Sequence, residues 1–170
     1  MRNLVLLLLL PYLMACNSKV YDLNALSNDR PTALIFISTE CPVSQKYIPK
    51  INQLAAEYPG IRFLGIFSPN ESGEGIRAYR QEHNVRFPTV TDADNVLLHQ
   101  LGATHTPEVF LVSVDKEIMY YGAIDNWYYN LEQLHQEPTD HFLKNAIESV
   151  LQHKPVFLKD TRPVGCRIEQ

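Results

Sequence analysis

The stretch that decides the fold is residues 33–42, Ala-Leu-Ile-Phe-Ile-Ser-Thr-Glu-Cys-Pro. Its first five residues are apolar and mostly branched or aromatic, which predicts a short buried strand. Pro42 is typical of the first position of a helix, so Cys41 falls at the N-cap. There the free backbone N–H groups and the positive end of the helix dipole stabilise a thiolate, although the neighbouring carboxylate of Glu40 works against this. The sequence therefore predicts a strand, a reactive cysteine and a helix in direct succession.

The elements expected on either side alternate between strands and helices. We expect strands at residues 33–38, 61–67, 108–114 and 117–122, a short extended piece at 87–91, and helices at 42–58, 73–84, 94–101 and from about 139 to 151. Asp94 is the expected cap of the short third helix and Gly102 its end. A tight turn at Asp115-Lys116 predicts an antiparallel hairpin. Parallel strands with crossover helices, followed by a hairpin and a last helix, describe an α/β domain of three layers with a mixed central sheet.

The first residues are expected to be a leader rather than part of the domain. Arg2 precedes an apolar run at residues 4–10, which is short for a membrane span but fits a secretory signal. Leu13-Met14-Ala15-Cys16 resembles a bacterial lipobox, which implies cleavage before Cys16 and a lipid on that residue; the alternative is an ordinary signal peptide with an incidental cysteine. The predicted division is 1–15 signal peptide, 16–30 tether, 31–154 domain and 155–170 tail.

The amino-acid composition limits the kinds of molecule that the protein is expected to bind. A chain of 170 residues suits one domain, and 45% hydrophobic with 20% charged residues is ordinary for a soluble globular protein. The formal net charge is −4 and no run of Lys or Arg occurs. Nucleic acid is therefore not an expected partner.

Two prolines connect the cysteine to a known family. Pro49 falls inside the predicted helix, eight residues after Cys41, and Thr106-Pro107 directly precedes the third main strand. Together with Cys-Pro-Val-Ser at residues 41–44, they resemble the thioredoxin superfamily over about residues 30–155. The resemblance implies a thioredoxin-like fold in which Pro49 kinks the helix. It also implies that Thr106-Pro107 is a cis bond lying against the thiol.

The details of the motif separate this chain from the two best-known activities of that superfamily. A thioredoxin has a second cysteine where Ser44 stands, so a local Cys-x-x-Cys exchange is excluded. Ser38, three residues before Cys41, resembles the hydroxyl that binds peroxide oxygen in redoxins of the alkyl hydroperoxide reductase/thiol-specific antioxidant type. The proline that peroxiredoxins carry four residues before that hydroxyl is Leu34 here. The resemblance therefore implies a slow thiol peroxidase at most.

A second cysteine, Cys166, lies in the polar tail beyond the last predicted helix. If Cys16 carries lipid, Cys41 and Cys166 remain for an exported domain in an oxidising compartment. Eleven residues from Pro155 span enough distance, at ~3.3 Å each, to cross a domain face. Cys166 is then the expected resolving thiol for a sulfenate or mixed disulfide on Cys41. The alternative is a structural disulfide that pins the tail of a non-catalytic interaction domain.

His105 stands two residues before Pro107, in the loop expected to face Cys41. It is interpreted as a base or hydrogen-bond partner that lowers the pKa of Cys41, or as a plain polar loop residue. A third interpretation comes from the Sco-type copper chaperones, which share the fold and bind copper with two cysteines and a histidine. That resemblance implies a copper site made of Cys41, His105 and Cys166.

Aromatic and acidic residues elsewhere in the sequence are further candidates for positions near this site. Trp127-Tyr128-Tyr129 is expected to cover an apolar edge, with a substrate groove as the less favoured alternative. Glu108 follows Pro107 and is a candidate neighbour of the thiol. The sequence assigns no definite role to Asp125.

The sequence thus predicts an exported thiol-dependent oxidoreductase or slow peroxidase without a cofactor, lipid-anchored in a bacterial cell envelope. Its expected partners are a protein or small-molecule thiol or peroxide substrate and an envelope reductant. A Sco-like copper module and a non-catalytic interaction domain are the alternatives. The candidate site residues are Cys41, Cys166, Pro107, His105, Ser38 and Ser44.

Overall fold

The computed structural model describes residues 21–128 and 130–169. The predicted signal peptide and the lipidation site Cys16 lie outside the described residues, so both stay predictions. Within the part that is described, no helix is both long and apolar enough to cross a membrane.

A five-stranded mixed sheet forms the centre of the domain, in the order β3-β2-β1-β5-β6. The strands are β1 (Thr32–Phe36), β2 (Arg62–Phe67), β3 (Thr89–Thr91), β5 (Glu108–Val112) and β6 (Ile118–Gly122). β1 is parallel to β2 and β2 to β3, whereas β5 is antiparallel to both β1 and β6. The predicted α/β class, with its mixed central sheet and terminal hairpin, is confirmed.

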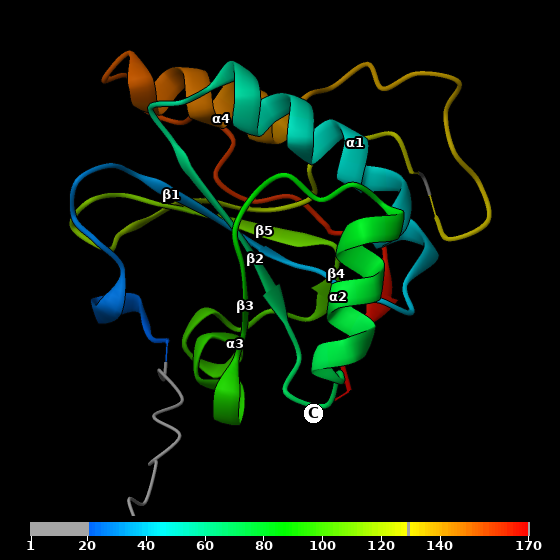
Figure 1. Cartoon of the computed structure of the whole chain (residues 1–170). Helices are drawn as coiled ribbons and strands as arrows, with labels where there is room; N and C mark the ends of the chain where they lie inside the picture. The colour runs from blue at the N-terminus through cyan, green and yellow to red at the C-terminus, as the bar shows by residue number, and fades with distance from the viewer. Residues whose placement is uncertain (1–20, 129, 170) are drawn as a thin grey trace, which may run out of the picture.

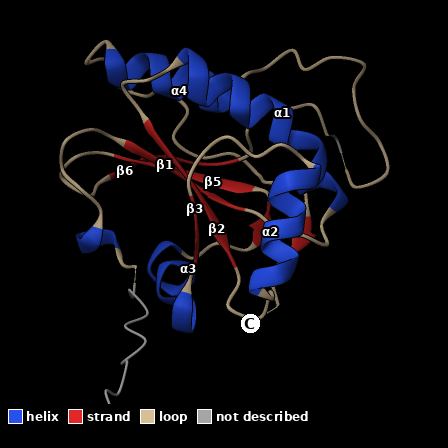
Figure 2. Cartoon of the chain, viewed as in Figure 1, coloured by secondary structure: helices blue, strands red, loops and turns tan. Residues whose placement is uncertain are grey.

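Helices cover both faces of this sheet. They are α1 (Pro42–Glu57), α2 (Gly73–Glu82), α3 (Val96–Leu101) and α4 (Phe142–Leu151), with short 3-10 turns at Leu23–Ala25 and Ala93–Asn95. Figure 1 shows α1 and α4 side by side along one face, with α3 on the opposite face. The same layers are visible by colour in Figure 2, where the strands lie between the helices.

The alternation of side chains along β1 builds the two halves of the core. Successive side chains of a strand point to opposite faces, and every residue of β1 is buried. Ala33 and Ile35 join the larger apolar cluster, which contains residues of α1, α2 and α4. Leu34 and Phe36 join the smaller cluster, which contains residues of α3. A strand buried on both faces carries an unbroken apolar run, which is why this stretch predicts the fold so well.

The cap of α3 differs from the prediction. Asp94 does not cap the helix, because it adopts the left-handed region at φ 59°. Instead the carboxylate of Asp92 accepts hydrogen bonds from the N–H groups of Leu97 (3.0 Å) and Leu98 (2.9 Å). Gly102 ends the helix as predicted, at φ 70°.

The segment predicted as a tether is in part a component of the domain. Leu26 is buried in the smaller apolar cluster. Lys116 Nζ donates to the carbonyl oxygen of Leu26 (2.7 Å), and Arg62 forms an ion pair with Asp29. The tether prediction is therefore wrong for residues 21–30, since single apolar side chains within this polar stretch pack on the sheet.

The chain beyond α4 is ordered against the domain. Tyr121 of β6 exchanges two hydrogen bonds with the tail, donating from its N–H to the carbonyl of Lys159 (2.9 Å) and accepting from the N–H of Thr161 (3.1 Å). Further along, β7 (Cys166–Arg167) pairs antiparallel with β4 (His105–Thr106) as a separate two-stranded sheet. The tail therefore ends beside the junction of β1 and α1.

Candidate active site

Cys41 occupies the N-cap of α1, as the sequence predicts. Its backbone is extended (φ −85°, ψ 110°), and Pro42 fills the first helical position. The carbonyl of Cys41 accepts the first helical hydrogen bond, from the N–H of Gln45 (3.1 Å). The thiol thus sits where the unpaired N–H groups of a helix converge, which favours its ionised form.

The loop before β5 closes over this thiol. The Thr106-Pro107 peptide bond is cis, which confirms that prediction. The Cys41 thiol donates a hydrogen bond to the carbonyl oxygen of Thr106 (2.9 Å). Only 1% of the surface of Cys41 is exposed, so a reagent reaches it only through the immediate surroundings of the thiol.

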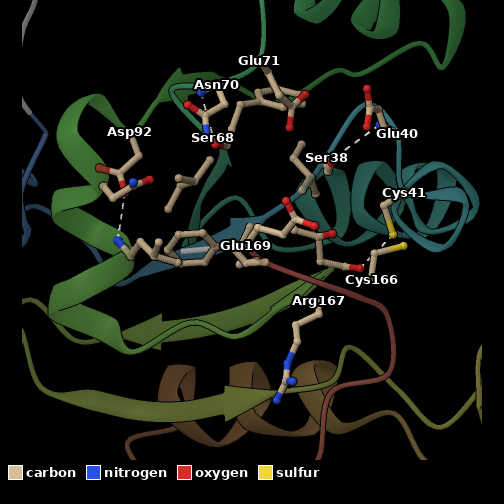
Figure 3. A pocket seen from close by; sticks show the side chains of 18 residues that line it. Ser38, Glu40, Cys41, Ser68, Asn70, Glu71, Asp92, Cys166, Arg167 and Glu169 are labelled. Atoms are coloured by element: carbon tan, nitrogen blue, oxygen red, sulfur yellow. Dashed lines mark hydrogen bonds between the residues drawn. The ribbon is translucent and has the colours of Figure 1, made fainter.

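The C-terminal tail places Cys166 next to Cys41 and the cis-proline loop. In the β4–β7 ladder Cys166 lies opposite Thr106, the residue whose carbonyl contacts Cys41. The N–H of Ile168 donates to the carbonyl of Thr104 (2.9 Å) and extends this pairing by one residue. Figure 3 shows the two sulfur atoms next to each other, and both cysteines are free thiols. Two residues that are 125 positions apart in the sequence thus share one site.

Gly165 permits this close approach. A Cβ atom at this position would lie 2.1 Å from the carbonyl oxygen of Thr106 and 2.7 Å from its carbon. No side chain fits at that distance from backbone atoms, so only glycine lets the tail reach β4. Sequence reasoning missed this role, because nothing in the local pattern around Gly165 announces a partner 59 residues away.

The surroundings of Cys41 lower its pKa despite its burial. Burial is the largest influence and raises the pKa, because it disfavours the charged form. It is outweighed by hydrogen bonds from the thiol of Cys166, the N–H of Ser44, the side chain of Thr106 and the N–H of Cys166. The pKa of Cys41 therefore lies below the ordinary thiol value.

Cys166 has the opposite character. Burial, the hydrogen bond to Cys41 and the charge of Cys41 together raise the pKa of Cys166 to about 12. The second and third of these causes originate in Cys41 itself. Once the Cys41 sulfur is covalently modified and carries no charge, those two causes disappear and Cys166 ionises more easily.

The two predicted serines lie beside the thiol in different ways. Ser44 is fully buried in the first turn of α1, and its N–H is one of the groups that lower the pKa of Cys41. Its hydroxyl accepts a long hydrogen bond (3.4 Å) from the N–H of Ser38. Ser38 lines the cavity next to Cys41, and its hydroxyl accepts from the N–H of Glu40 (3.2 Å).

His105 and Glu108 organise the loop rather than the thiol. The Glu108 carboxylate is buried and accepts from the N–H groups of Thr104 (2.6 Å) and His105 (3.0 Å). The His105 ring bonds through Nδ1 to the Thr104 hydroxyl (2.8 Å), and His105 is not among the residues that line the cavity. Within residues 21–128 and 130–169 no group of three or more His, Cys, Asp or Glu side chains could hold a metal ion. Copper binding stays a prediction of the sequence, and no step is derived through it.

Trp127 and Tyr128 pack in or against the larger apolar cluster. Tyr128 is buried and belongs to the larger apolar cluster, and Trp127 packs edge-on against Tyr47 (5.6 Å between ring centres). The buried carboxylate of Asp125 accepts from the Tyr47 hydroxyl (2.6 Å) and the Trp127 N–H (3.0 Å). Neither aromatic ring lines the cavity, so the favoured prediction, cover for an apolar edge, is confirmed for these two residues.

A cavity of about 380 Å³ opens beside the two thiols (Figure 3). Its walls come from the ends of β1 and β2, the loops that follow them, the start of α3 and the tail. The residues that carry charge or sulfur in these walls are Cys41, Cys166, Glu40, Glu71, Asp92, Arg167 and Glu169. A space of this size accommodates a small organic molecule.

Comparison with known proteins gives a consistent picture at the level of the family. The family model described as AhpC/TSA matches residues 11–121. Among curated proteins the chain is similar to the thiol:disulfide interchange protein DsbE of Yersinia pestis, with 29% identity over 107 residues, which is 63% of this chain and 56% of that protein. It is also 29% identical over 68 residues to the soluble secreted antigen MPT53 of Mycobacterium tuberculosis, covering 40% of this chain and 39% of the antigen. The chain therefore spans little more than half the length of the curated DsbE relative.

Solved structures share the fold at lower identity. A conserved protein of Geobacillus kaustophilus superposes with a TM-score of 0.68 at 24% identity, covering 84% of this chain and 78% of that one. A secreted disulfide oxidoreductase of M. tuberculosis, homologous to DsbE of Escherichia coli, superposes with a TM-score of 0.54 at 20% identity, over 76% of this chain and 87% of that one. These likenesses confirm the thioredoxin-like arrangement.

Proposed function

The chain belongs to the AhpC/TSA family, and on that premise we propose that it is a thiol–disulfide oxidoreductase with Cys41 as nucleophile and Cys166 as resolving thiol. One observation carries the proposal. The carbonyl of Thr106 accepts from the Cys41 thiol at 2.9 Å, while Thr106 is also the ladder partner of Cys166. A single residue of the cis-proline loop thereby aligns both thiols.

The chemistry proceeds in two exchanges. The Cys41 thiolate attacks one sulfur of a substrate disulfide, forming a mixed disulfide and releasing the other half as a thiol. Cys166 then attacks the Cys41 sulfur, forms the Cys41–Cys166 bond and releases the second thiol. Overall the protein loses two hydrogens and the substrate disulfide gains them. An external dithiol returns the protein to its reduced form by the reverse exchange.

The two pKa values fit these separate roles. A lowered pKa increases the fraction of Cys41 present as the attacking thiolate near neutral pH. The raised pKa of Cys166 keeps that thiol protonated until Cys41 has reacted, so that it does not compete for the substrate. A peroxide follows the same order more slowly: Cys41 becomes a sulfenic acid with loss of an alcohol or water, and Cys166 converts it to the disulfide with loss of water.

The cellular setting is proposed from the same relatives. The curated matches are a thiol:disulfide interchange protein and a secreted antigen. We extend an extracytoplasmic location to this chain, with the predicted lipid at Cys16 as its anchor and an envelope thiol protein as its reductant. Since Ser44 replaces the second cysteine of a Cys-x-x-Cys pair, the tail supplies the partner thiol that the helix lacks.

Thiol mapping by mass spectrometry tests the proposal. The purified protein is treated with graded reductant, alkylated and digested, and the state of each cysteine is read from its peptides. We expect a Cys41–Cys166 bond that opens in mild reductant and re-forms with a small disulfide, while Cys166→Ser stops at a mixed disulfide on Cys41. Two thiols that stay free under oxidant contradict the proposal. A bond that resists mild reductant contradicts it as well and supports a structural disulfide instead.

A further inference from the structure

The route to Cys41 is narrow in this fold. The thiol is 1% exposed, and the backbone edge of β4 beside it is already paired with β7. An extended polypeptide therefore finds this edge occupied while the tail is docked. The cavity of about 380 Å³ has Cys41 and Cys166 in its wall and offers the remaining approach for a molecule of limited size.

The walls of this cavity are unevenly charged. They include four acidic residues, Glu40, Glu71, Asp92 and Glu169, and a single basic one, Arg167. Figure 3 shows the Arg167 side chain extending away from Glu40 and Glu71, on the far side of the tail strand. Within a concave, partly apolar space, an excess of one sign of charge raises the local concentration of the opposite sign.

The carboxylates differ in what they already bind. Asp92 accepts from two N–H groups at the start of α3, and one oxygen of Glu71 accepts from the N–H of Thr39 (3.0 Å). Glu40 and Glu169 are exposed at the rim. Their charges act on an entering molecule without first giving up a contact with the fold.

The deep wall of the cavity is apolar. It is formed by side chains at the ends of β1 and β2 and on α3, namely Phe36, Ile37, Ile66, Phe67 and Leu98. Such a wall favours methylene groups, whereas the rim favours cations. The combination suits a short alkyl chain that ends in an amine.

We propose that this cavity is the substrate site of the thiol pair and that it selects small disulfides of positive charge over neutral and anionic ones. The inference rests on the proposed function, whose chemistry it keeps. Cys41 forms a bond to one sulfur of the ammonium-bearing disulfide while the S–S bond breaks, and the aminothiol leaves as a thiolate that takes a proton from solvent. Cys166 then forms the internal disulfide and releases the second aminothiol.

Three small disulfides of different charge provide the test: cystamine (cationic), hydroxyethyl disulfide (neutral) and dithiodiglycolate (anionic). For each disulfide, the rate at which the reduced protein forms the Cys41–Cys166 bond is divided by the rate at which the same disulfide reacts with 2-mercaptoethanol. This normalisation removes the differences in intrinsic reactivity among the three disulfides. We expect the normalised rates to fall in that order, with about a tenfold span at low ionic strength. The span should shrink at high salt, because mobile ions screen exposed charges.

Variants at the rim assign the selectivity to this cavity. The double variant Glu40→Gln/Glu169→Gln should reduce the cation-to-anion ratio about threefold. Because this ratio compares two disulfides on the same thiol, any change in the Cys41 thiolate caused by the loss of the Glu40 charge cancels from it. Glu117→Gln removes another exposed carboxylate, in the β5–β6 turn and not among the residues that line the cavity, and is the matched control, which should leave the ratio unchanged.

The outcomes separate this inference from the function on which it rests. Equal normalised rates for the three disulfides, or a ratio that the rim variant leaves unchanged, overturn the cavity as the selecting site. If the neutral disulfide still produces the Cys41–Cys166 bond in that case, the proposed function stands. Failure of all three disulfides to produce the bond overturns both.

Discussion

The two cysteines are held by regions of opposite kind. Cys41 is covalently part of the β1–α1 junction, whose strand is buried on both faces and whose helix packs in the larger apolar cluster. Cys166 belongs to a two-residue strand on a tail, held by backbone hydrogen bonds and by the absence of a side chain at Gly165. Moving the first requires disruption of the core, whereas moving the second requires only that the tail leave its place.

This difference suits the two steps of a dithiol reaction. A nucleophile benefits from fixed surroundings, because its reactivity depends on donors that stay in position. A resolving thiol must instead give way to the substrate and then return. The tail is fastened upstream, where the Thr161 hydroxyl accepts from the N–H of Ala123 (2.9 Å) and bonds with the Tyr120 hydroxyl (2.6 Å). Residues beyond Thr161 can therefore move while the tail stays anchored.

The largest expected effect comes from removing the fixed thiol. Cys41→Ser should reduce the reaction with small disulfides more than about a thousandfold, to the background of the uncatalysed exchange. Cys166→Ser, its matched partner, should keep the first exchange and accumulate a mixed disulfide on Cys41. Stopped-flow consumption of the disulfide, followed by intact mass, distinguishes the two. If Cys166→Ser abolishes the first exchange too, the roles assigned to the two regions are wrong.

The second-largest effect is expected when the tail is displaced while both cysteines are kept. Gly165→Ala places a Cβ atom 2.1 Å from the Thr106 oxygen, so β7 must shift from β4. We expect the internal disulfide to form about a hundredfold more slowly, since a displacement of 1 Å costs that much when two groups must meet. The first exchange at Cys41 should continue, and a transient mixed disulfide should be visible by mass. Gly73→Ala, at the start of α2 where the nearest atom to an added Cβ is in the Arg77 side chain at 3.6 Å, is the control.

A smaller effect is expected on the acidity of Cys41. The hydrogen bond from the Cys166 thiol is the strongest of the influences that lower the pKa of Cys41. Cys166→Ala should therefore raise that pKa, and Cys166→Ser, which restores a donor, should keep it low. Thiolate absorbance near 240 nm against pH measures both. For the unaltered protein the pKa of Cys41 is lowered from its ordinary value, and the pKa of Cys166 is raised to about 12. Equal titration midpoints for Cys41 and Cys166 would contradict the assignment of a lowered pKa to the first and a raised pKa to the second.

The smallest effect on thiol chemistry should follow a change in the core. Tyr47→Phe removes the hydroxyl that donates to the buried Asp125 carboxylate at 2.6 Å and leaves the Trp127 N–H as a donor at 3.0 Å, which should cost about 1–3 kcal/mol of unfolding free energy. Denaturant unfolding measures this loss. Tyr58→Phe removes a similar bond to Glu148 in a more open setting and should cost less than about 1 kcal/mol. Both variants should form the internal disulfide at the unaltered rate, and a slower rate in Tyr47→Phe would mean that the thiol region depends on this buried bond.

Local signals in the sequence were enough for the nucleophile region. A buried apolar run followed by Cys41-Pro42 specifies strand, N-cap and helix over ten neighbouring residues, and Thr106-Pro107 specifies the cis bond of the family. Each of these features arises from backbone restrictions within a few residues. Such restrictions are visible in the sequence before any tertiary contact forms.

Features that depend on distant parts of the chain could not be predicted in this way. The choice of Asp92 over Asp94 as the cap of α3 was decided by the left-handed backbone that follows β3. The docking of Leu26, the bond between Asp125 and Tyr47, and the role of Gly165 all join residues many positions apart. Glu71 lines the same cavity as Cys41 for the same reason, since the loop after β2 and the start of α1 come together only in the folded sheet.

The pairing of β4 with β7 also joins the oxidation state of the protein to its resistance to heat. A bond between Cys41 and Cys166 would enclose most of the domain in one covalent ring, including four of the five strands of the sheet, β2, β3, β5 and β6. Restricting an unfolded chain by a ring of that size is worth about 5 kcal/mol in the chain-entropy account. By thermodynamic linkage the folded domain holds the bond more firmly against reductants than its unfolded chain does. A melting curve would thus report how much of a preparation is oxidised.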